Sequence, residues 1–490
     1  NFIYQKYKDY GIVTRLSANG KWALVTGAST EQKTSGYVRL VNVATGEENI
    51  LCQGNETQAD VMGKYEGCDV TDDGNIIVGA FGGEFTMDGY YTGKPGYWNK
   101  STKKWTALPM PKGATVAVAT SVTPDGRYAL GTSETDVTDW MSSVSEGVMW
   151  DLTTGKIVDL PGRPVMEMDK TPSGNPYAQQ ESFTGMSADG RYIVVYGNQS
   201  YTPINYVYDR EKGTYFQFGK QGTNAPSDFL QMEPNGAMIS SNGKWVAGTI
   251  RTVNDNVYPL LYNMETGEYT YYNSKEEDDL GVDIVTNDGE LIASSPTTSP
   301  IRQWQFITGN VWYPFEQIMQ QRYGLSYSDY TGFTNTGSVF GLSNDGKTVA
   351  VMVSPQGESY IATLPEALNT SCQNIDLFKD YTVEPSEGAE YHWMESLTLT
   401  FSNDIVVLGD KKSAVLKDKN GKTIRSSIAF HKNPTHNRVL EITFRATEMN
   451  SGEDYTVEIP AGKIGLAKNS SKTNGNITLH IKGRGDVPEK

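Results

Sequence analysis

A four-residue phrase recurs seven times in the first 346 residues: a hydroxylated residue, any residue, Asp or Asn, and then Gly. The glycines of successive copies are 46 to 64 residues apart, an interval too long for a helical solenoid unit and typical of a unit of about four strands. The copies lie at residues 17–20, 71–74, 123–126, 187–190, 240–243, 286–289 and 343–346.

Each copy predicts a tight hairpin turn, because Asn, Asp and Gly tolerate the positive φ that a two-residue connection between twisted strands requires. Apolar runs follow the turns, as at residues 21–25, 191–195 and 244–248, and they predict buried strands. A second turn signal separates the third strand from the fourth. It lies at Thr45-Gly46, Thr154-Gly155, Gly213, Thr266-Gly267 and Thr308-Gly309.

This pattern of turn, strand and second turn resembles the propeller repeats of the WD40-like and TolB-like families. The resemblance covers about three quarters of the chain and implies a seven-bladed β-propeller over residues 1–365. It is informative about the fold and not about activity, because propellers host unrelated functions. Trp22, Trp98, Trp150 and Trp245 fall at equivalent strand positions and are predicted to lie in the core.

The seventh repeat is short by one strand. Residues 337–344, 347–353 and 359–364 supply three strands, and no fourth strand follows before Pro365. The N-terminal segment, residues 1–7, is a candidate for the missing outer strand. Such sharing of a blade between the two ends would close the ring and remove an open sheet edge.

A different β pattern begins at about Asp376, and apolar and polar residues alternate in each of its strand-like runs. These runs start at Ser396, Arg438, Tyr455 and Asn476. The order of the phrases resembles the bacterial immunoglobulin-like domains of surface-layer and adhesion proteins, which implies a β-sandwich over residues 376–484 that serves as a spacer or docking module. The expected fold class is therefore all-β, a seven-bladed β-propeller plus a C-terminal immunoglobulin-like β-sandwich.

Charge and apolar patterning limit the partners. The formal net charge of −16 disfavours nucleic acid and anionic membrane surfaces, and no run of about 18 apolar residues predicts a transmembrane segment. The chain starts at Asn1 and not at Met, which favours a removed leader and therefore an extracellular, cell-surface or periplasmic protein, with envelope anchoring through that leader left open.

The sequence predicts no metal site and no cofactor. Cys52, Cys68 and Cys372 lack metal-ligand spacing, and both a Cys52–Cys68 disulfide and free thiols stay open. All four histidines follow the propeller repeats, so chemistry in the propeller cannot use a histidine base. A glycan-active enzyme using two loop carboxylates remains an alternative. Its candidate acids are Glu84, Asp88, Glu134, Asp136, Asp139, Glu167 and Asp169.

Both classes of tight turn belong on one rim of the ring, so the longer connections are expected together on the opposite rim, where function on a rigid scaffold collects. Aromatic residues in these connections suit sugar rings or peptides, and packing of the same rings against the blades is the alternative. They are Phe85, Tyr90, Tyr91, Trp140, Tyr177, Tyr201, Tyr258, Tyr323, Tyr327 and Tyr330. The leading hypothesis is a binding protein for a glycan or a surface protein, and a structural scaffold subunit is a further alternative.

Overall fold

The computed structural model of the 490-residue chain divides into two compact units. Unit 1 comprises residues 1–273, 278–298 and 327–370, and unit 2 comprises residues 274–277, 299–326 and 371–490. The structure describes all residues except 1–2, 8–10, 28–37, 53–64, 83–92, 136–143, 164–179, 200–201, 220–228, 233–236, 273–280, 295–303, 326–337, 355–357, 386–389, 392–395, 425–426, 446–448 and 484–490.

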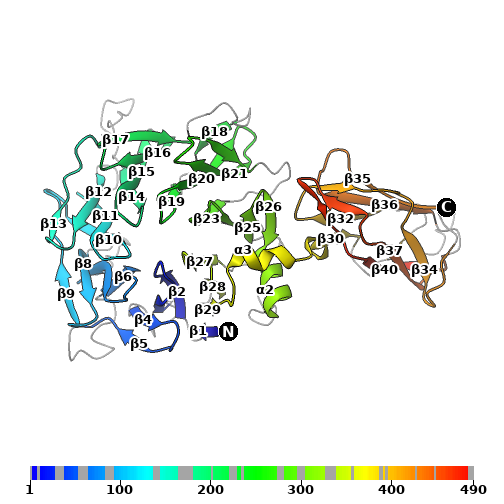
Figure 1. Ribbon diagram of the computed structural model, residues 1–490, viewed down its shortest axis with the longest axis horizontal. Coiled ribbons are helices and arrows are strands. Elements are labelled where there is room, and N and C mark those ends of the chain that lie inside the picture. The colour runs from blue at the N-terminus through cyan, green and yellow to red at the C-terminus, as the bar shows by residue number, and fades with distance from the viewer. Residues whose placement is uncertain are drawn as a thin grey trace, which may run out of the picture. The chain divides into compact units, whose positions relative to one another are not determined.

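Unit 1 is built from antiparallel sheets that follow one another along the chain and surround a common centre (Figure 1). The first two sheets are β2 Gly11–Leu16, β3 Trp22–Gly27, β4 Val38–Asn42 and β5 Glu48–Ile50, then β6 Tyr65–Val70, β7 Ile76–Phe81, β8 Lys94–Asn99 and β9 Lys104–Ala107. The third repeat contains β10 Val116–Val122, β11 Tyr128–Glu134, β12 Ser145–Asp151 and β13 Lys156–Ile157, and the fourth contains β14 Gln180–Met186, β15 Tyr192–Gln199, β16 Thr202–Asp209 and β17 Thr214–Phe218. A parallel pairing of Ser145 with Gln180 joins these two repeats into one eight-stranded sheet.

The last three repeats follow the same plan, so the predicted β-propeller is confirmed. The fifth sheet is β18 Phe229–Met232, β19 Met238–Ile239, β20 Trp245–Thr252, β21 Val257–Asn263 and β22 Tyr269–Tyr271. The sixth repeat contributes the hairpin β23 Gly281–Val285 and β24 Leu291–Ser294 to unit 1. The seventh sheet is β27 Ser338–Leu342, β28 Thr348–Ser354, β29 Glu358–Thr363 and, as its outer strand, β1 Ile3–Tyr7.

The N-terminal strand β1 completes the seventh sheet. It pairs antiparallel with β29, with Ile3 opposite Thr363 and Tyr7 opposite Ser359. The predicted closure by residues 1–7 is therefore confirmed. Because the first and last strands of the repeat array share one sheet, the seventh sheet has four strands although its own repeat encodes three.

The recurring phrase is a hydrogen-bonded turn, and its hydroxylated residue, its Asp or Asn and its glycine each have a physical role. In the first copy Ser17 Oγ donates to Asn19 Oδ1 (2.8 Å) and accepts from the backbone N–H of Trp22 (3.1 Å). In six of the seven copies the hydroxylated residue is nearly fully buried, so its side chain must find partners inside the protein. The following Gly20 has φ 70°, and the hairpin glycines of all seven copies have positive φ, as the sequence predicts.

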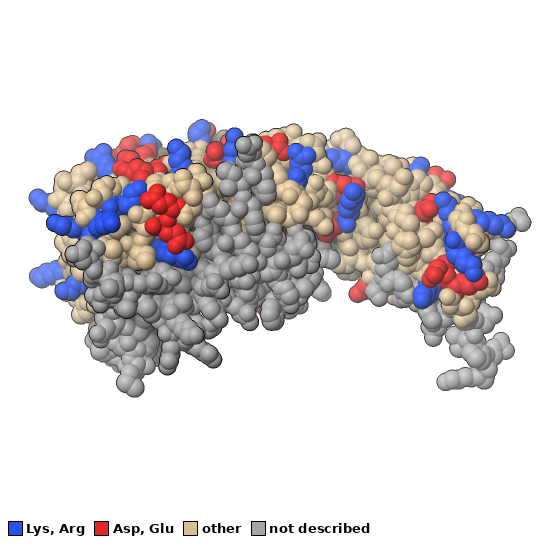
Figure 2. All heavy atoms as spheres, turned by 90° about the horizontal axis from the view of Figure 1, so that it is seen from below, with Lys and Arg blue, Asp and Glu red and all other residues tan. Residues whose placement is uncertain are grey.

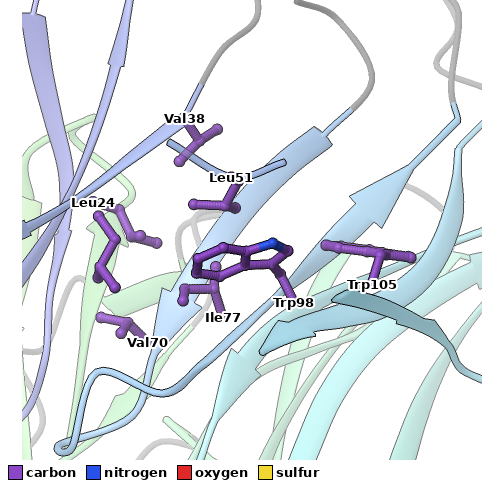
Figure 3. Packing of buried hydrophobic residues seen from close by; sticks show 8 residues of the cluster. Leu24, Val38, Leu51, Val70, Ile77, Trp98 and Trp105 are labelled. Atoms are coloured by element: carbon purple, nitrogen blue, oxygen red, sulfur yellow. The ribbon is translucent and has the colours of Figure 1, made fainter. Parts of the chain in front are cut away.

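The cores lie between neighbouring sheets. Leu24 and Leu51 from the first repeat pack against Ile77 and Trp98 of the second, and Figure 3 shows the Trp98 ring between Ile77 and Trp105. The Trp98 indole N–H donates to the carbonyl of Cys52 (2.8 Å), so this polar atom is satisfied. Trp98 and Trp150 are buried, as predicted, whereas Trp22 and Trp245 are half-buried. Cys52, Cys68 and Cys372 form no disulfide bond with one another.

The C-terminal part of unit 2 is also all-β, and its four predicted strand runs are confirmed. One sheet contains β30 Tyr381–Glu384, β32 Ser396–Phe401, β36 Val439–Arg445 and β35 Ser427–Lys432. A second contains β31 Glu390–Tyr391, β40 Ile477–Gly483, β37 Asp454–Ile459 and β34 Val415–Asp418, and a third contains β33 Ile405–Val407, β38 Ile464–Leu466 and β39 Asn469–Thr473. Alternate residues of β32, β37 and β40 are buried. The immunoglobulin-like identity of this module stays a prediction.

Unit 2 also includes a hairpin and a helix from within the sixth repeat. These are β25 Trp304–Thr308, β26 Val311–Pro314 and α2 Phe315–Tyr323, and short helices α3 Leu368–Ser371, η2 Cys372–Asn374 and η3 Leu377–Lys379 precede the C-terminal sheets. One of the longer connections expected between repeats thus begins as a helix, and Phe315, Ile318 and Met319 form its buried face. No helix of the described residues is long and apolar enough to cross a bilayer.

Two side-chain amides attach this hairpin and helix to the C-terminal sheets inside unit 2. The amide of Asn403 accepts from the backbone N–H of Trp312 (2.9 Å) and donates to the carbonyl of the same residue (2.7 Å). The amide of Gln321 likewise accepts from the N–H of Asp376 (3.0 Å) and donates to its carbonyl (3.2 Å). Each amide thereby bonds to both the N–H and the C=O of one residue, as the backbone of a neighbouring β-strand would.

Candidate functional site

A cavity of about 290 Å³ lies at the centre of unit 1. Every one of the seven repeats contributes to its wall through its innermost strand or the turn after it. The same repeat position, two residues before the hydroxylated residue, lines the cavity each time. These residues are Arg15, Asp69, Ser121, Gly185, Met238, Ile284 and Gly341.

A β-bulge accompanies this position in six of the seven innermost strands. The register shifts at Thr14 in β2, at Thr184 in β14 and at Asp283 in β23, and β6, β10 and β27 shift at the equivalent residue. A bulge places an extra residue in one strand and re-aims the side chains beside it. The bulges therefore form a ring, and two of the extra residues, Thr184 and Asp283, line the cavity themselves.

One ion pair connects three neighbouring repeats at the cavity wall. Arg15 Nε donates to Asp69 Oδ1 (3.1 Å), and Asp69 Oδ2 accepts from the N–H of Val122 (2.8 Å). Asp69 Oδ1 also accepts from its neighbour's N–H at Val70 (3.0 Å). Asp69 is thus a positioning residue that joins β2, β6 and β10. The Arg15 side chain is 41% exposed, and its Nη2 lies 3.5 Å from Ser121 Oγ.

Asp283 is the other carboxyl group of the cavity wall. It is reached by solvent, but protein atoms surround it on the remaining sides, and this burial raises its pKa to about 6, although a hydrogen bond with the Ser294 side chain acts in the opposite direction. Ile239, Ile284 and Leu342 line the cavity as well. The site therefore combines apolar walls with one carboxylate whose charge changes in mildly acidic solution.

Hydrogen bonds between the turns of different repeats hold the turn side of the cavity together. The N–H of Asn19 donates to Asp72 Oδ1 (2.8 Å), and the N–H of Ala188 donates to the carbonyl of Ser241 (2.7 Å). The N–H of Asn344 donates to the carbonyl of Ala18 (2.7 Å), and its side-chain amide donates to Ser241 Oγ (3.0 Å). Because these bonds join different repeats, the wall is a preorganised surface.

The predicted aromatic residues divide into two groups. Phe85, Tyr90, Tyr91, Trp140, Tyr177, Tyr201, Tyr327 and Tyr330 lie outside the described residues, so their proposed role stays a prediction. Tyr258 lies in β21 and not in a loop; it is 5% exposed and packs with Val246 and Leu260 in the core. Tyr323 ends α2 in unit 2, where its hydroxyl is hydrogen-bonded to Ser371 Oγ (2.5 Å).

Of the carboxylates considered for glycan cleavage, Glu134 lies at the end of β11, and the others lie outside the described residues. Among the described residues, no three His, Cys, Asp or Glu side chains are grouped as metal ligands. Sequence reasoning did not identify Arg15, Asp69 or Asp283. A usable signal existed for Arg15 and Asp69, because both are charged residues at the same repeat position, two residues before the hydroxylated residue of the turn phrase. Asp283 lies one position earlier in its repeat.

Comparisons with known proteins concern the fold. No protein-family model and no curated protein matches the sequence. Similar solved structures include TolB from Acinetobacter baumannii, with 12% identity and a TM-score of 0.31 over 68% of this chain and 60% of that chain. A prolyl endopeptidase has 12% identity and a TM-score of 0.45 over 80% of this chain and 55% of that one. The β-propeller domain of the Trilobed protease from Pyrococcus furiosus has 10% identity and a TM-score of 0.45, over 74% and 95%.

Proposed function

We propose that this protein is a non-catalytic binding protein whose propeller recognises a segment of a protein partner in its central cavity. The observation that carries the proposal is the cavity wall, to which all seven repeats contribute a residue at the same position. Residues from seven repeats converge on one space, and the turn-side hydrogen bonds hold them in place before any ligand arrives.

The size and lining of the cavity support a peptide segment as its occupant. About 290 Å³ is at the lower end of the range for small-molecule sites, so it accommodates one or two side chains and not a folded domain. The guanidinium of Arg15 and the carboxyl of Asp283 supply polar contacts, and Met238, Ile239 and Leu342 supply apolar ones. This mixture suits a side chain with its adjoining peptide groups.

The longer connections of the propeller are proposed to form a second contact surface on the rim opposite to the tight turns, and a glycan is the alternative ligand for their aromatic residues. The resemblance of the repeats to TolB-like propellers supports a secreted or cell-surface location for this protein. In this proposal the C-terminal module acts as a spacer or docking module. The protein could then serve as a scaffold subunit that binds other proteins in a surface complex.

The test is panning of displayed random peptides and a glycan array against the full chain. Gly185 offers the blocking variant, because a Cβ there would meet only Ile239 Cγ2 at 3.8 Å, an ordinary contact. Gly185→Trp fills the cavity, and Gly185→Ala is the control for losing glycine. Peptides that bind the wild type and Gly185→Ala but not Gly185→Trp support the proposal. Peptides that bind all three proteins, or glycan binding alone, would overturn it.

A further inference from the structure

The charges that line the central cavity do not balance. Three charged residues line it, namely Arg15, Asp69 and Asp283. Arg15 and Asp69 are paired at 3.1 Å, and the Asp69 carboxylate is further satisfied by two backbone N–H groups. Among the described lining residues, no positively charged side chain is left to neutralise the carboxylate of Asp283.

The strands packed against β23 add no free cation near Asp283. They are β19, β20, β21, β24 and β27, and their one charged residue is Arg251 of β20, which forms an ion pair with Asp255. Their titratable tyrosines are Tyr258 and Tyr262 of β21. The partner of Asp283 that is identified inside the fold is the neutral side chain of Ser294.

The groups next to Asp283 suit an aliphatic chain. Met238 and Ile239 of β19, Ile284 of β23 and Leu342 of β27 line the same cavity, and β19 and β27 both pack against β23. Lysine and arginine bury their methylene stems along apolar surface and extend the charged end to a polar partner. A carboxylate beside an apolar wall in a cavity of about 290 Å³ is complementary to such a side chain.

We propose that the central cavity binds a cationic group on an aliphatic stem, the side chain of a lysine or arginine in the partner polypeptide, with Asp283 as its counter-ion. This inference rests on the proposed function and names the chemistry that the same cavity selects. Figure 2 shows acidic and basic side chains interspersed over the described part of one face, so the inference is argued from the cavity and not from a charged patch on that face.

Occupancy of the cavity is then coupled to the protonation of Asp283. Its pKa of about 6 in the free protein means that the carboxylate is charged at neutral pH and neutral in mildly acidic solution. A bound cation favours the charged form and lowers the pKa of Asp283, and by the same linkage acidification weakens binding.

The experiment measures binding of three short blocked peptides to the full chain, identical except for one central lysine, norleucine or glutamate. Norleucine keeps the aliphatic stem and removes the charge. We expect the lysine peptide to bind at least about tenfold more tightly than the norleucine peptide at neutral pH. The preference should vanish in Asp283→Asn, which keeps an acceptor for Ser294, and should shrink below about pH 6.

Asp288→Asn is the matched control, because Asp288 is an exposed acid of the same hairpin and does not line the cavity. It should keep the lysine preference. Equal binding of the lysine and norleucine peptides, absence of lysine-peptide binding, or an undiminished preference in Asp283→Asn would each overturn the inference. If the inference is overturned but the panned peptides still bind the wild type and not Gly185→Trp, the proposed function stands without a lysine or arginine side chain as the ligand. Spermidine binding that is lost in Asp283→Asn would support cation recognition and identify a free polyamine as its source.

Discussion

The indole of Trp22 lies directly over the Cα of Gly74, so that a Cβ at Gly74 would overlap the ring. Trp22 follows the hairpin turn of the first repeat, and Gly74 is the turn glycine of the second. Tyr128 covers Gly190 in the same way, and Trp245 covers Gly289. These three turn glycines therefore have two roles, because each adopts positive φ and also receives an aromatic ring from the preceding repeat.

We predict that Gly74→Ala destabilises unit 1 more than the same change at a turn glycine without a ring above it. The φ of 69° at Gly74 and the overlap with Trp22 together predict a loss of about 2–5 kcal/mol. Gly155→Ala is the control, because Gly155 has φ 68° and nothing within 4 Å of an added Cβ, which predicts about 1–2 kcal/mol. Thermal and urea unfolding measure both, and equal losses would show that the ring contact contributes nothing.

Deleting residues 1–8 should lower the melting temperature and promote self-association. The deletion removes β1 and exposes the edge of β29 along the five residue pairs from Ile3–Thr363 to Tyr7–Ser359. Calorimetry and light scattering are the measurements. Removal of residues 1–2 alone, which precede β1, is the control. A deleted protein that stays monomeric and melts with the wild type would contradict a stabilising role for the closing strand.

Asn403→Ala should destabilise unit 2 by about 2–4 kcal/mol, because it leaves the buried N–H and C=O of Trp312 without the amide that now pairs with both. Asn420→Ala, at an exposed turn, should change stability by less than about 0.5 kcal/mol. Chemical denaturation followed by a probe on unit 2 distinguishes the two. Similar unfolding midpoints for both variants would mean that the amide pairing does not stabilise the unit.

Asp283→Asn should raise the stability of unit 1 at about pH 8 and leave it unchanged at about pH 4. Burial raises the folded-state pKa of Asp283 to about 6 from a usual value of 3.8, so the folded state binds the proton more tightly. Wild-type stability therefore falls as pH rises from about 4 to about 6, and an uncharged amide avoids this loss. Melting temperatures across this pH range check the prediction, with Asp288→Asn as control. A stability difference that is constant with pH would refute it.

The turn phrase made the repeat architecture predictable, because its chemistry is complete within a few residues. The hydroxyl of Ser17, the amide of Asn19 and the N–H of Trp22 lie within six residues and bond to one another. Positive φ at Gly20 is equally local. The candidate site was not predictable in the same way. Tyr258 was placed in a loop from the sequence, yet β20 and β21 extend through that region and bury its ring.

The sequence by itself therefore determined the hairpins and the number of repeats, since each depends on short-range patterns that recur along the chain. The closing strand was predictable for a different reason, because the seventh repeat encodes one strand too few. Only the tertiary structure decided which residues face the central cavity and that residues 315–323 form a helix. Arg15 meets Asp69 across 54 residues, and Asn403 meets Trp312 across 91. Such pairs form because packing brings distant strands together, and no local pattern in the sequence encodes that distance.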